Sequence, residues 1–462
     1  MSNVIKANPA KRFFVEMLTR DIDLDDAILD LLDNSLDGLL RITEGDYSQY
    51  PNYEVNIELS EDQFKITDNC GGIPTDIAQK YAFRMGRPSG RDDDIPTIGM
   101  YGIGMKRSVF KMGKDIQVSS QNTENCFLVK IPESWLTDDE NWELEMTDCV
   151  ETFSDKGTNI IVRNLYPGIS ELFSSDSDFR SRLMDKISIH YAFVLRSGLL
   201  IKINGKAIVG KDIAILTEFN EDAIKSKKGI LPFIYREDND GLQIEIVCGL
   251  VDAPPSLAED SEAAESTKVD RVDAGWTIMC NDRVVLYADR TRLTGWGDCL
   301  PQFHYQFNTL VGVVNFKSNM ASKLPVTTTK RGIDASSDVY LRIRRKMCDA
   351  MRIYINYTNK WKNKREEERE HVIPKSETKS LSKLITKDFE EMMTTSTDGY
   401  GGKVYKPRLP EPPEEDDGIR TIKYRKHIDD IKKISEDYFE DNSLTPNKVG
   451  EKCFEDILYQ VK

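Results

Sequence analysis

The chain has 462 residues, enough for about three domains of ordinary size and for more than one hydrophobic core. It is 39% hydrophobic and 31% charged, a composition that excludes disorder of the whole chain. Lys and Arg number 63 against 78 Asp and Glu, which gives a net charge of −15. A protein that coats nucleic acid with its whole surface is basic, so that class is excluded and any nucleic-acid contact must be a local patch.

The four histidines lie far apart in the sequence, which argues against a zinc site or a multi-histidine metal centre. The eight cysteines are scattered singly, without a Cys-x-x-Cys pair, and this pattern is typical of a reducing compartment. No stretch approaches the roughly 18 apolar residues that span a bilayer, and the N-terminus has no apolar run. We therefore expect a cytoplasmic protein that does not contact a membrane.

Composition divides the chain into three expected domains, at residues 1–168, 169–345 and 346–462. The first holds most of the glycine motifs, the second mixes strand and helix patterns, and the third is highly charged. Within the third, the acidic, proline-rich stretch 409–418 predicts a linker. Apolar residues at three- and four-residue spacing after it predict a short amphipathic helix.

Residues 24–40 predict a helix whose apolar side chains form one stripe. The opposite face carries acidic and amide side chains at helical spacing, namely Asp26, Asp30, Asp33, Asn34 and Asp37. Like charges at this spacing repel each other unless a cation binds between them. The face is therefore either solvated or a site for a hard cation with bound waters.

Alternating apolar and polar residues over 53–59 and 63–67 predict a β-hairpin. The hairpin leads to Asp68, which is followed by the glycine pair that ends with Gly72. A carboxylate at a strand end then lies beside backbone that a planar ligand can approach closely.

A second glycine cluster directly precedes a predicted helix. Gly99, Gly102 and Gly104 leave free backbone amides at the helix N-terminus, and Lys106 adds a cation in its first turn. Both features suit phosphate binding. The dinucleotide fingerprint is excluded, because its third glycine position is Arg107.

A stretch that resembles a Walker A loop is also excluded. Residues 205–211 have much of its spacing, but Asp212 takes the place of the required Ser or Thr. Residues 200–209 instead predict a hairpin that turns at Asn204 and Gly205.

Four motifs in this order resemble those of the GHKL ATPases, the superfamily named for gyrase, the heat-shock 90 chaperone, histidine kinases and MutL. They are the segments 30–38, 68–73, 99–104 and 156–158. Each motif alone is weak, whereas their order is specific. The resemblance implies an α+β fold that begins with a Bergerat-type ATP-binding α/β sandwich, in which helices cover one face of a mixed sheet. A transducer-like α/β domain and a charged, partly helical tail would follow.

The resemblance also implies ATP and Mg²⁺ as cofactors. Asn34 would hold Mg²⁺ with the triphosphate, and Asp37 of the same motif would be a further nucleotide-binding residue. Asp68 would accept a hydrogen bond from the adenine amino group, and Gly72 would let the base approach. Asp30 stands where the family usually has the Glu that acts as general base; it is one methylene shorter, so we expect slow hydrolysis.

The remaining site residues follow from the same resemblance. The glycine-rich loop and the start of its helix would cover the phosphates through Gly99, Gly102, Ile103, Gly104, Met105 and Lys106. Thr158 would support the water network near adenine. Residues 81–96 resemble the mobile lid that closes over ATP.

In the second region, residues 276–286 resemble the segment of MutL- and MORC-type proteins that carries an Asn and an Arg at a strand turn. Residues 307–316 predict a buried strand. The loop that follows matches the transducer loop whose lysine reaches the γ-phosphate, with Lys330 as the match and Arg331 as the reserve candidate. An ordinary exposed loop is the alternative.

The layout resembles MutL- and MORC-type proteins most closely. It implies an ATP-hydrolysing switch in which ATP closes the lid and drives homodimerisation, and which acts as a molecular clamp on DNA or on a DNA-associated partner. The alternatives are a chaperone-like ATPase that acts on protein clients and a nucleotide-gated scaffold with little hydrolysis. The basic residues of 341–365 form either a salt-bridged helix face or a local contact for nucleic-acid phosphates.

Overall fold

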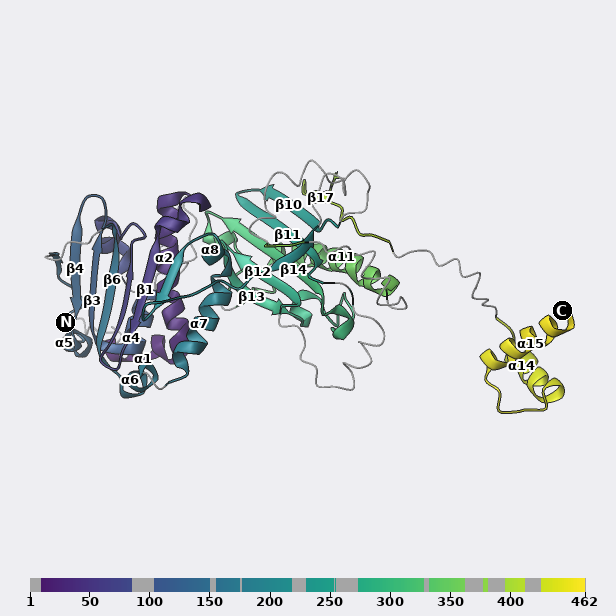
Figure 1. Cartoon of the computed structure of the whole chain (residues 1–462). Helices are drawn as coiled ribbons and strands as arrows, with labels where there is room; N and C mark the ends of the chain where they lie inside the picture. Colours follow the sequence, from purple (N-terminus) through teal and green to yellow (C-terminus); the bar gives the residue numbers. More distant parts are fainter. Residues whose placement is uncertain are drawn as a thin grey trace, which may run out of the picture. The chain divides into compact units, whose positions relative to one another are not determined.

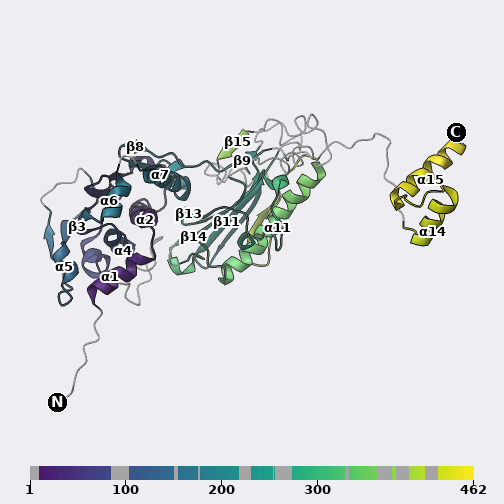
Figure 2. The ribbon, with the colours of Figure 1, turned by 90° about the horizontal axis from the view of Figure 1, so that it is seen from below.

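The protein is described by a computed structural model that covers residues 10–84, 104–149, 155–174, 177–217, 230–252, 254, 273–327, 332–361, 377–380, 395–411 and 425–461. The chain divides into two compact units, Met1–Pro412 and Pro413–Lys462. The first unit holds two large β-sheets with their helices, and the second is helical (Figures 1 and 2).

The elements of the first sheet and its helices come first in the chain. They are α1 (Lys11–Arg20), α2 (Leu24–Thr43), η1 (Tyr47–Asn52), β1 (Glu54–Leu59), β2 (Gln63–Asp68), α3 (Thr75–Ile77), η2 (Ala78–Ala82), α4 (Gly104–Met112), β3 (Gly113–Gln121), β4 (Cys126–Ile131), α5 (Glu133–Thr137), β5 (Met146–Asp148), β6 (Gly157–Leu165), α6 (Pro167–Phe173), α7 (Phe179–His190), α8 (Ala192–Arg196), β7 (Leu200–Ile203) and β8 (Lys206–Ala207).

The second sheet and its surroundings follow. Their elements are β9 (Ala214–Thr217), β10 (Phe233–Asn239), β11 (Leu242–Leu250), β12 (Gly275–Cys280), β13 (Arg283–Asp289), η3 (Arg292–Thr294), η4 (Tyr305–Phe307), β14 (Leu310–Ser318), η5 (Ala321–Lys323), α11 (Asp338–Trp361), β15 (Glu377–Ser380), β16 (Thr395–Thr397) and β17 (Lys403–Tyr405).

The first sheet is mixed, as the family resemblance implies. Its eight strands lie in the order β5-β4-β3-β6-β2-β1-β7-β8, and only β1 and β7 run parallel. Val55, Ile57 and Leu59 of β1 are buried whereas the positions between them are at least partly exposed, because successive strand side chains point to opposite faces. These residues share one hydrophobic core with the apolar side chains of α2 and α4, so the helices form a second layer against the sheet.

Both hairpins predicted for this sheet are present. β1 and β2 pair antiparallel, and β7 pairs with β8. Asn204 and Gly205 join β7 to β8 with positive φ angles of 47° and 79°, as a two-residue hairpin turn of type I′ requires. A phosphate-binding loop of the Walker type is therefore absent from residues 205–211, all of which the structure describes.

The first sheet extends beyond residue 168, where the sequence suggested a domain boundary. β7 joins the sheet edge parallel to β1, and β8 extends the sheet to Ala207. A strand that joins a sheet in parallel is reached through a crossover connection, and α6, α7 and α8 lie in the chain between β6 and β7.

The second sheet has seven strands in the order β13-β12-β14-β11-β10-β17-β16. β12 and β14 are parallel and the other neighbours antiparallel. β14 is buried along nearly its whole length, in agreement with the strand predicted at 307–316, although Tyr305–Phe307 forms η4 instead. Tyr340, Met347 and Tyr354 of α11 belong to the core of this sheet.

The region from residue 346 onward differs from the expected charged tail. Instead of leaving the second domain, α11 is one layer of its core, and β16 and β17 extend the sheet at β10. Tyr357 donates a hydrogen bond of 2.9 Å to the carbonyl of Pro410, and Lys360 lies 2.7 Å from a carboxylate oxygen of Glu411. The first residues of the predicted linker 409–418 therefore pack against α11; residues 412–418 lie outside the described residues.

The second unit consists of α14 (Ile428–Lys433), the π-helix η7 (Ile434–Tyr438) and α15 (Pro446–Val461). The segment after the linker in which the sequence predicts a helix contains α14 and η7. Across the described part of the chain, no helix is both long enough and apolar enough to cross a membrane.

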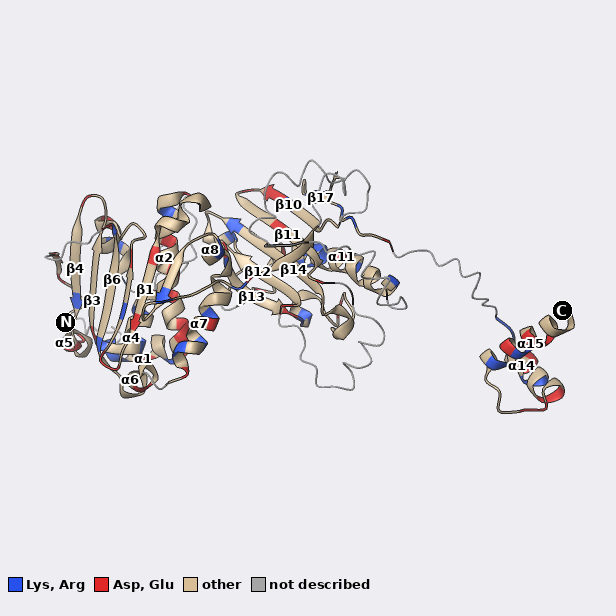
Figure 3. Ribbon diagram, viewed as in Figure 1, with Lys and Arg blue, Asp and Glu red and all other residues tan. Residues whose placement is uncertain are grey.

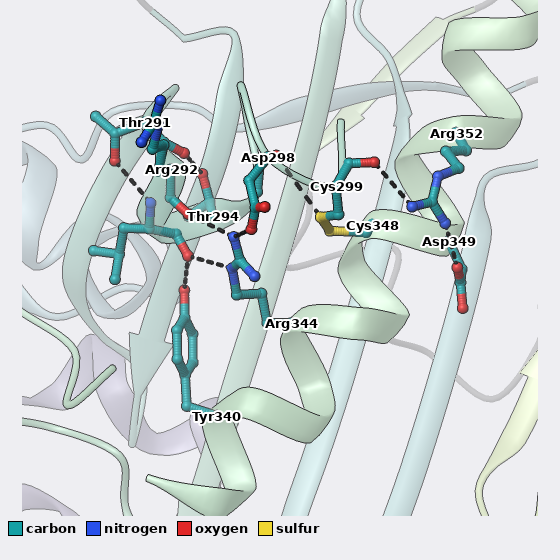
Figure 4. Close-up of a disulfide and its surroundings, with 12 residues drawn as sticks. Thr291, Arg292, Thr294, Asp298, Cys299, Tyr340, Arg344, Cys348, Asp349 and Arg352 are labelled. Atoms are coloured by element: carbon teal, nitrogen blue, oxygen red, sulfur yellow. Dashed lines mark hydrogen bonds and ion pairs between the residues drawn. A yellow bond between two sulfur atoms is a disulfide. The ribbon is translucent and has the colours of Figure 1, made fainter. Parts of the chain in front are cut away.

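Two disulfides join four of the cysteines, for which the sequence spacing indicated no partner. Cys126 bonds to Cys149 and Cys299 to Cys348, with Cα atoms 5.5 and 6.3 Å apart. The Cys299–Cys348 bond ties α11 to the loop after η3, where Arg352 donates to the Cys299 carbonyl (Figure 4). The sequence pattern suggested reduced thiols because partners 23 and 49 residues apart show no local motif.

We predict that alkylation of the unfolded chain without reductant modifies Cys70, Cys248, Cys280 and Cys453 only. Cys348→Ser should lower the free energy of unfolding by about 2–4 kcal/mol, because the loop that it leaves open gains freedom in the unfolded chain. Peptide mapping by mass spectrometry and denaturant unfolding are the measurements. Alkylation of all the cysteines without reductant would show that these bonds do not form.

Candidate functional site

Helix α2 carries the acidic face predicted from the sequence, but its residues have different environments. Asp30 and Asp33 are buried, at 3% and 0% exposure, whereas Asn34 is exposed and Asp37 partly buried. The sequence left two alternatives for this face, solvent and a hard cation. Asp30 and Asp33 fit neither, because each carboxylate pairs with an arginine.

Asp30 pairs with the helix that follows the glycine-rich motif. Arg107 of α4 donates to its Oδ2 atom from Nε at 2.8 Å and from Nη2 at 2.5 Å. A Cβ atom added to Gly104, the first residue of α4, would lie 3.6 Å from the same oxygen. The expected base and the start of the expected phosphate-binding helix are therefore neighbours, and a cation already binds the base.

Asp33 pairs with the second sheet. Its Oδ1 atom lies 2.7 Å from Nε of Arg283, the first residue of β13, and accepts a 2.8 Å hydrogen bond from the hydroxyl of Tyr191. All three side chains are buried. Burial by itself lowers the Arg283 pKa, but the negative charge of Asp33 outweighs this, and the pKa is raised.

The turn before Arg283 binds the first domain as well. Asn281 and Asp282 connect β12 to β13 with φ angles of 46° and 66°. Asp282 accepts a 2.5 Å hydrogen bond from the hydroxyl of Tyr47 and lies 2.9 Å from the ammonium group of Lys317. This turn is the segment in which the sequence suggested an Asn and an Arg, and it forms a polar contact between the two sheets' domains.

Asp68 lies at the end of β2, facing α2. Its carboxylate accepts hydrogen bonds from Ser35 Oγ at 2.8 Å, from the Cys70 amide at 2.9 Å and from the Thr158 amide at 3.3 Å. Burial raises the pKa of Asp68, and the hydrogen bonds partly oppose this. The structure thus brings together Asp68 and Thr158, which the sequence assigned to one site, and Ser35 ties them to the helix turn that carries Asn34.

Close backbone packing surrounds Asp68. A Cβ atom added to Gly157 would lie 1.8 Å from the Asp68 carbonyl, and one added to Gly72 would lie 2.0 Å from the Gln121 carbonyl. Ser120 Oγ lies 3.0 Å from Thr158 Oγ1 and accepts from the Ile73 amide at 2.8 Å. Gly72 is therefore required by the protein backbone, independently of the approach of a base that the resemblance implies.

The first turn of α4 differs from the expectation for phosphate contacts. Lys106 is 2% exposed and donates a 2.8 Å hydrogen bond to the carbonyl of Ala82. Burial lowers its pKa to about 8. Met105 is partly buried against the core of the first sheet. In this conformation Lys106 fastens α4 to the start of the predicted lid.

Several expected site residues cannot be compared with the structure. Gly99, Gly102, Ile103 and Lys330 lie outside the described residues, as does Arg331, the reserve candidate. Of the predicted lid at 81–96, only the part that ends at Arg84 is described.

The basic residues of α11 are largely used within the protein. Arg342 pairs with Glu237 and Arg344 with Asp298, each with a shortest distance of 2.5 Å, and Lys346 lies 2.9 Å from a carboxylate oxygen of Asp398. Figure 3 shows acidic residues on β10 and basic residues on α11. The described part of 341–365 therefore matches the salt-bridged alternative for this segment.

Sequence reasoning missed Arg107, Ser35, Ser120 and Tyr191. For Arg107 the sequence offered a signal, because a basic residue in the first turn after the glycine-rich motif can pair with an acidic residue of the predicted helix that contains Asp30. Ser120 and Tyr191 carried no local signal, because each meets its partner only through strand register or helix packing.

Residues 22–154 match the protein family described as "Histidine kinase-, DNA gyrase B-, and HSP90-like ATPase". This match supports a GHKL-type ATPase domain in that segment and suggests that it binds ATP. It includes α2, Asp68 and α4 and ends before Thr158 and the second sheet. No curated protein matches the chain. The finer resemblance to MutL- and MORC-type proteins stays a prediction.

We predict that Arg283→Met lowers the free energy of unfolding by about 3–5 kcal/mol, because it leaves Asp33 buried without its cation. Chemical denaturation is the measurement. As a control, Arg12→Met removes the arginine of a solvent-exposed pair with Glu16 and should leave the unfolding transition unchanged. Equal stability of Arg283→Met and the wild type would contradict the buried pair.

Proposed function

We propose that the first domain binds ATP between α2 and the ends of β2 and β6. The observation that carries this proposal is the partly buried Asp68 carboxylate, which Ser35 and the Thr158 amide hold beside α2. A partly buried acceptor at this place suits the exocyclic amine of adenine, because a carboxylate accepts hydrogen bonds from N–H donors. The family match over residues 22–154 supports the same ligand.

We propose that Asn34, with Asp37 near it on α2, holds Mg²⁺ together with the triphosphate. An exposed amide and a partly buried carboxylate one helical turn apart offer hard oxygen ligands from one face of the helix. Mg²⁺, when bound, neutralises negative charge on the phosphates. The chain's own contribution is to fix α2, through Asp30, Asp33 and Ser35, at three places around Asn34.

For hydrolysis we propose Asp30 as the residue that orients the attacking water and accepts its proton. Its Oδ2 atom already accepts two hydrogen bonds from Arg107, and this ion pair competes with the water that Asp30 would orient. Turnover is therefore slow until Arg107 moves. This pair also favours the second candidate, a nucleotide-gated scaffold with little hydrolysis.

The proposed output is conformational. The buried Asp33–Arg283 pair is the direct link through which a change at α2 alters the second sheet. ATP-driven closure and homodimerisation, as in MutL- and MORC-type proteins, remain part of the proposal. Two arginines of α11 pair with acidic residues of the same chain. A clamp on DNA or on a DNA-associated partner would therefore use another surface.

Asn34→Ala should weaken the binding of Mg²⁺–ATP by at least about tenfold, since it removes a ligand from the site, without loss of stability because Asn34 is exposed. Isothermal titration calorimetry measures this. Asn447→Ala, which changes an exposed asparagine on α15, is the matched control. Wild-type affinity in Asn34→Ala would refute the assignment of the metal and phosphate side.

Asp30→Asn should slow ATP hydrolysis by about 100-fold or more, because the amide accepts no proton. It should leave nucleotide affinity within about threefold of the wild type. Phosphate release under saturating ATP is the measurement, with calorimetry alongside. An unchanged rate would assign the base to another residue, and a wild-type rate at the detection limit would favour the scaffold.

A further inference from the structure

The disulfide between Cys299 and Cys348 joins two parts of the second domain that lie 49 residues apart in the sequence. Cys348 belongs to α11, and Cys299 belongs to the loop at residues 290–300, which follows β13 and contains η3 (Figure 4). Cys348 is 2% exposed, whereas Cys299 is partly exposed. The bond therefore joins a buried residue to one at the surface, and an external thiol needs such access to exchange with a disulfide.

Hydrogen bonds from the same side of α11 also hold the 290–300 loop. Four residues of α11 at four-residue spacing contact the loop, namely Tyr340, Arg344, Cys348 and Arg352. The Tyr340 hydroxyl and the Nε atom of Arg344 each donate to the Leu293 carbonyl at 2.9 Å. Arg352 donates to the Cys299 carbonyl at 2.8 Å. The loop therefore keeps several contacts with α11 when the disulfide opens.

The position of α11 does not depend on the disulfide. Met347 and Met351 of this helix are 0% exposed and belong to the core of the second sheet. Opening the bond therefore frees the loop at one point and leaves the helix packed. A bond of this kind converts one folded form into another, as a switch requires, whereas the loss of a structural disulfide often unfolds its domain.

We propose that the Cys299–Cys348 disulfide is a redox switch that a dithiol reductant opens in the folded protein. One thiolate of the reductant attacks Sγ of Cys299, which forms a mixed disulfide and releases Cys348 as a thiolate. The second thiolate of the reductant then displaces Cys299, so the reductant becomes a disulfide and two electrons pass to the protein. The two cysteines take up the two protons that the reductant loses.

Two arginines flank Cys348 on α11. Arg344 and Arg352 lie about one helical turn before and after it, and both donate to the 290–300 loop. Arg344 also pairs with Asp298 at 2.5 Å, and Arg352 with Asp349 at 2.8 Å (Figure 4). Burial by itself disfavours a thiolate at Cys348, and guanidinium groups near it offset that cost. Cys348 is therefore a better leaving group than a buried cysteine without nearby cations.

The 290–300 loop continues β13, the strand that begins at Arg283. The Thr291 amide and the Thr294 hydroxyl donate to the Asp289 carboxylate at the end of this strand, at 3.0 and 2.6 Å. α2 thus holds the start of β13 through Asp33, and the disulfide-linked loop holds its end. The consequence for nucleotide rests on the proposed function: in the reduced protein, the second sheet follows ATP binding at α2 less firmly.

Reduction of the folded full-length chain without nucleotide tests the switch. The variant Cys126→Ser/Cys149→Ser removes the other disulfide, so the readout reports on Cys299–Cys348. Dithiothreitol without denaturant should make Cys299 accessible to iodoacetamide, as peptide mapping shows, with unchanged circular dichroism. Hydrogen exchange of the 290–300 loop should become about tenfold faster, and exchange of β3 and β6 should not change. Oxidised dithiothreitol should restore the slow exchange.

Three further variants serve as references. Cys299→Ser/Cys348→Ser should show the fast loop exchange with and without dithiothreitol. Arg344→Met should change loop exchange by less than about threefold in the oxidised protein, where the disulfide still holds the loop, and by about tenfold in the reduced protein. Arg345→Met removes an exposed arginine of the same helix and should have no effect in either state.

Two results would overturn the switch. One is a bond that dithiothreitol opens only together with unfolding, since this would make it a structural disulfide. The other is a reduced protein whose loop exchanges as slowly as in the oxidised form. Because neither measurement uses nucleotide, failure of ATP binding does not affect them. With a non-hydrolysable ATP analogue, an equal change at residues 280–284 in both redox states would refute only the link to nucleotide.

Discussion

The buried pair of Asp33 and Arg283 is the contact on which the arrangement of the first unit depends. Asp33 belongs to the helix that carries Asn34, and Arg283 opens a strand of the second sheet. A carboxylate and a guanidinium at 0% and 3% exposure are tolerated because each satisfies the other and because Tyr191 donates to the carboxylate. Neither domain can move freely without exposing or stranding one of these charges, so the position of α2 and that of the second sheet are linked.

Three side-chain contacts join α2 to three other elements. Asp30 meets Arg107 of α4, Asp33 meets Arg283 of β13, and Ser35 meets Asp68 of β2. Two of the acidic residues that contribute to the net charge of −15, Asp30 and Asp33, neutralise arginines inside the protein. The three contacts also leave Asn34 as the exposed polar residue at the centre of the helix, where the proposed metal and triphosphate bind.

Local sequence patterns predicted the helices and strands near the site. Features that depend on contacts between residues far apart in the sequence were not predicted. Period-two alternation identified β1 and β2, and the apolar stripe identified α2, because both signals are confined to a few residues. The burial of Asp33 had no such signal, since it depends on an arginine 250 residues later. The extension of the first sheet to Ala207 and the packing of α11 onto the second were missed for the same reason: strand order and helix contacts are set by tertiary structure.

The central claim is that nucleotide bound at α2 is sensed by the second sheet through Asp33 and Arg283. Hydrogen–deuterium exchange of the full chain, with and without a non-hydrolysable ATP analogue and Mg²⁺, tests it most directly. The account predicts slower exchange in α2 and at Asp68, together with a change in the β12–β13 turn at residues 280–284 that Arg283→Met abolishes. Protection confined to the first sheet, with the turn unaffected, would contradict it.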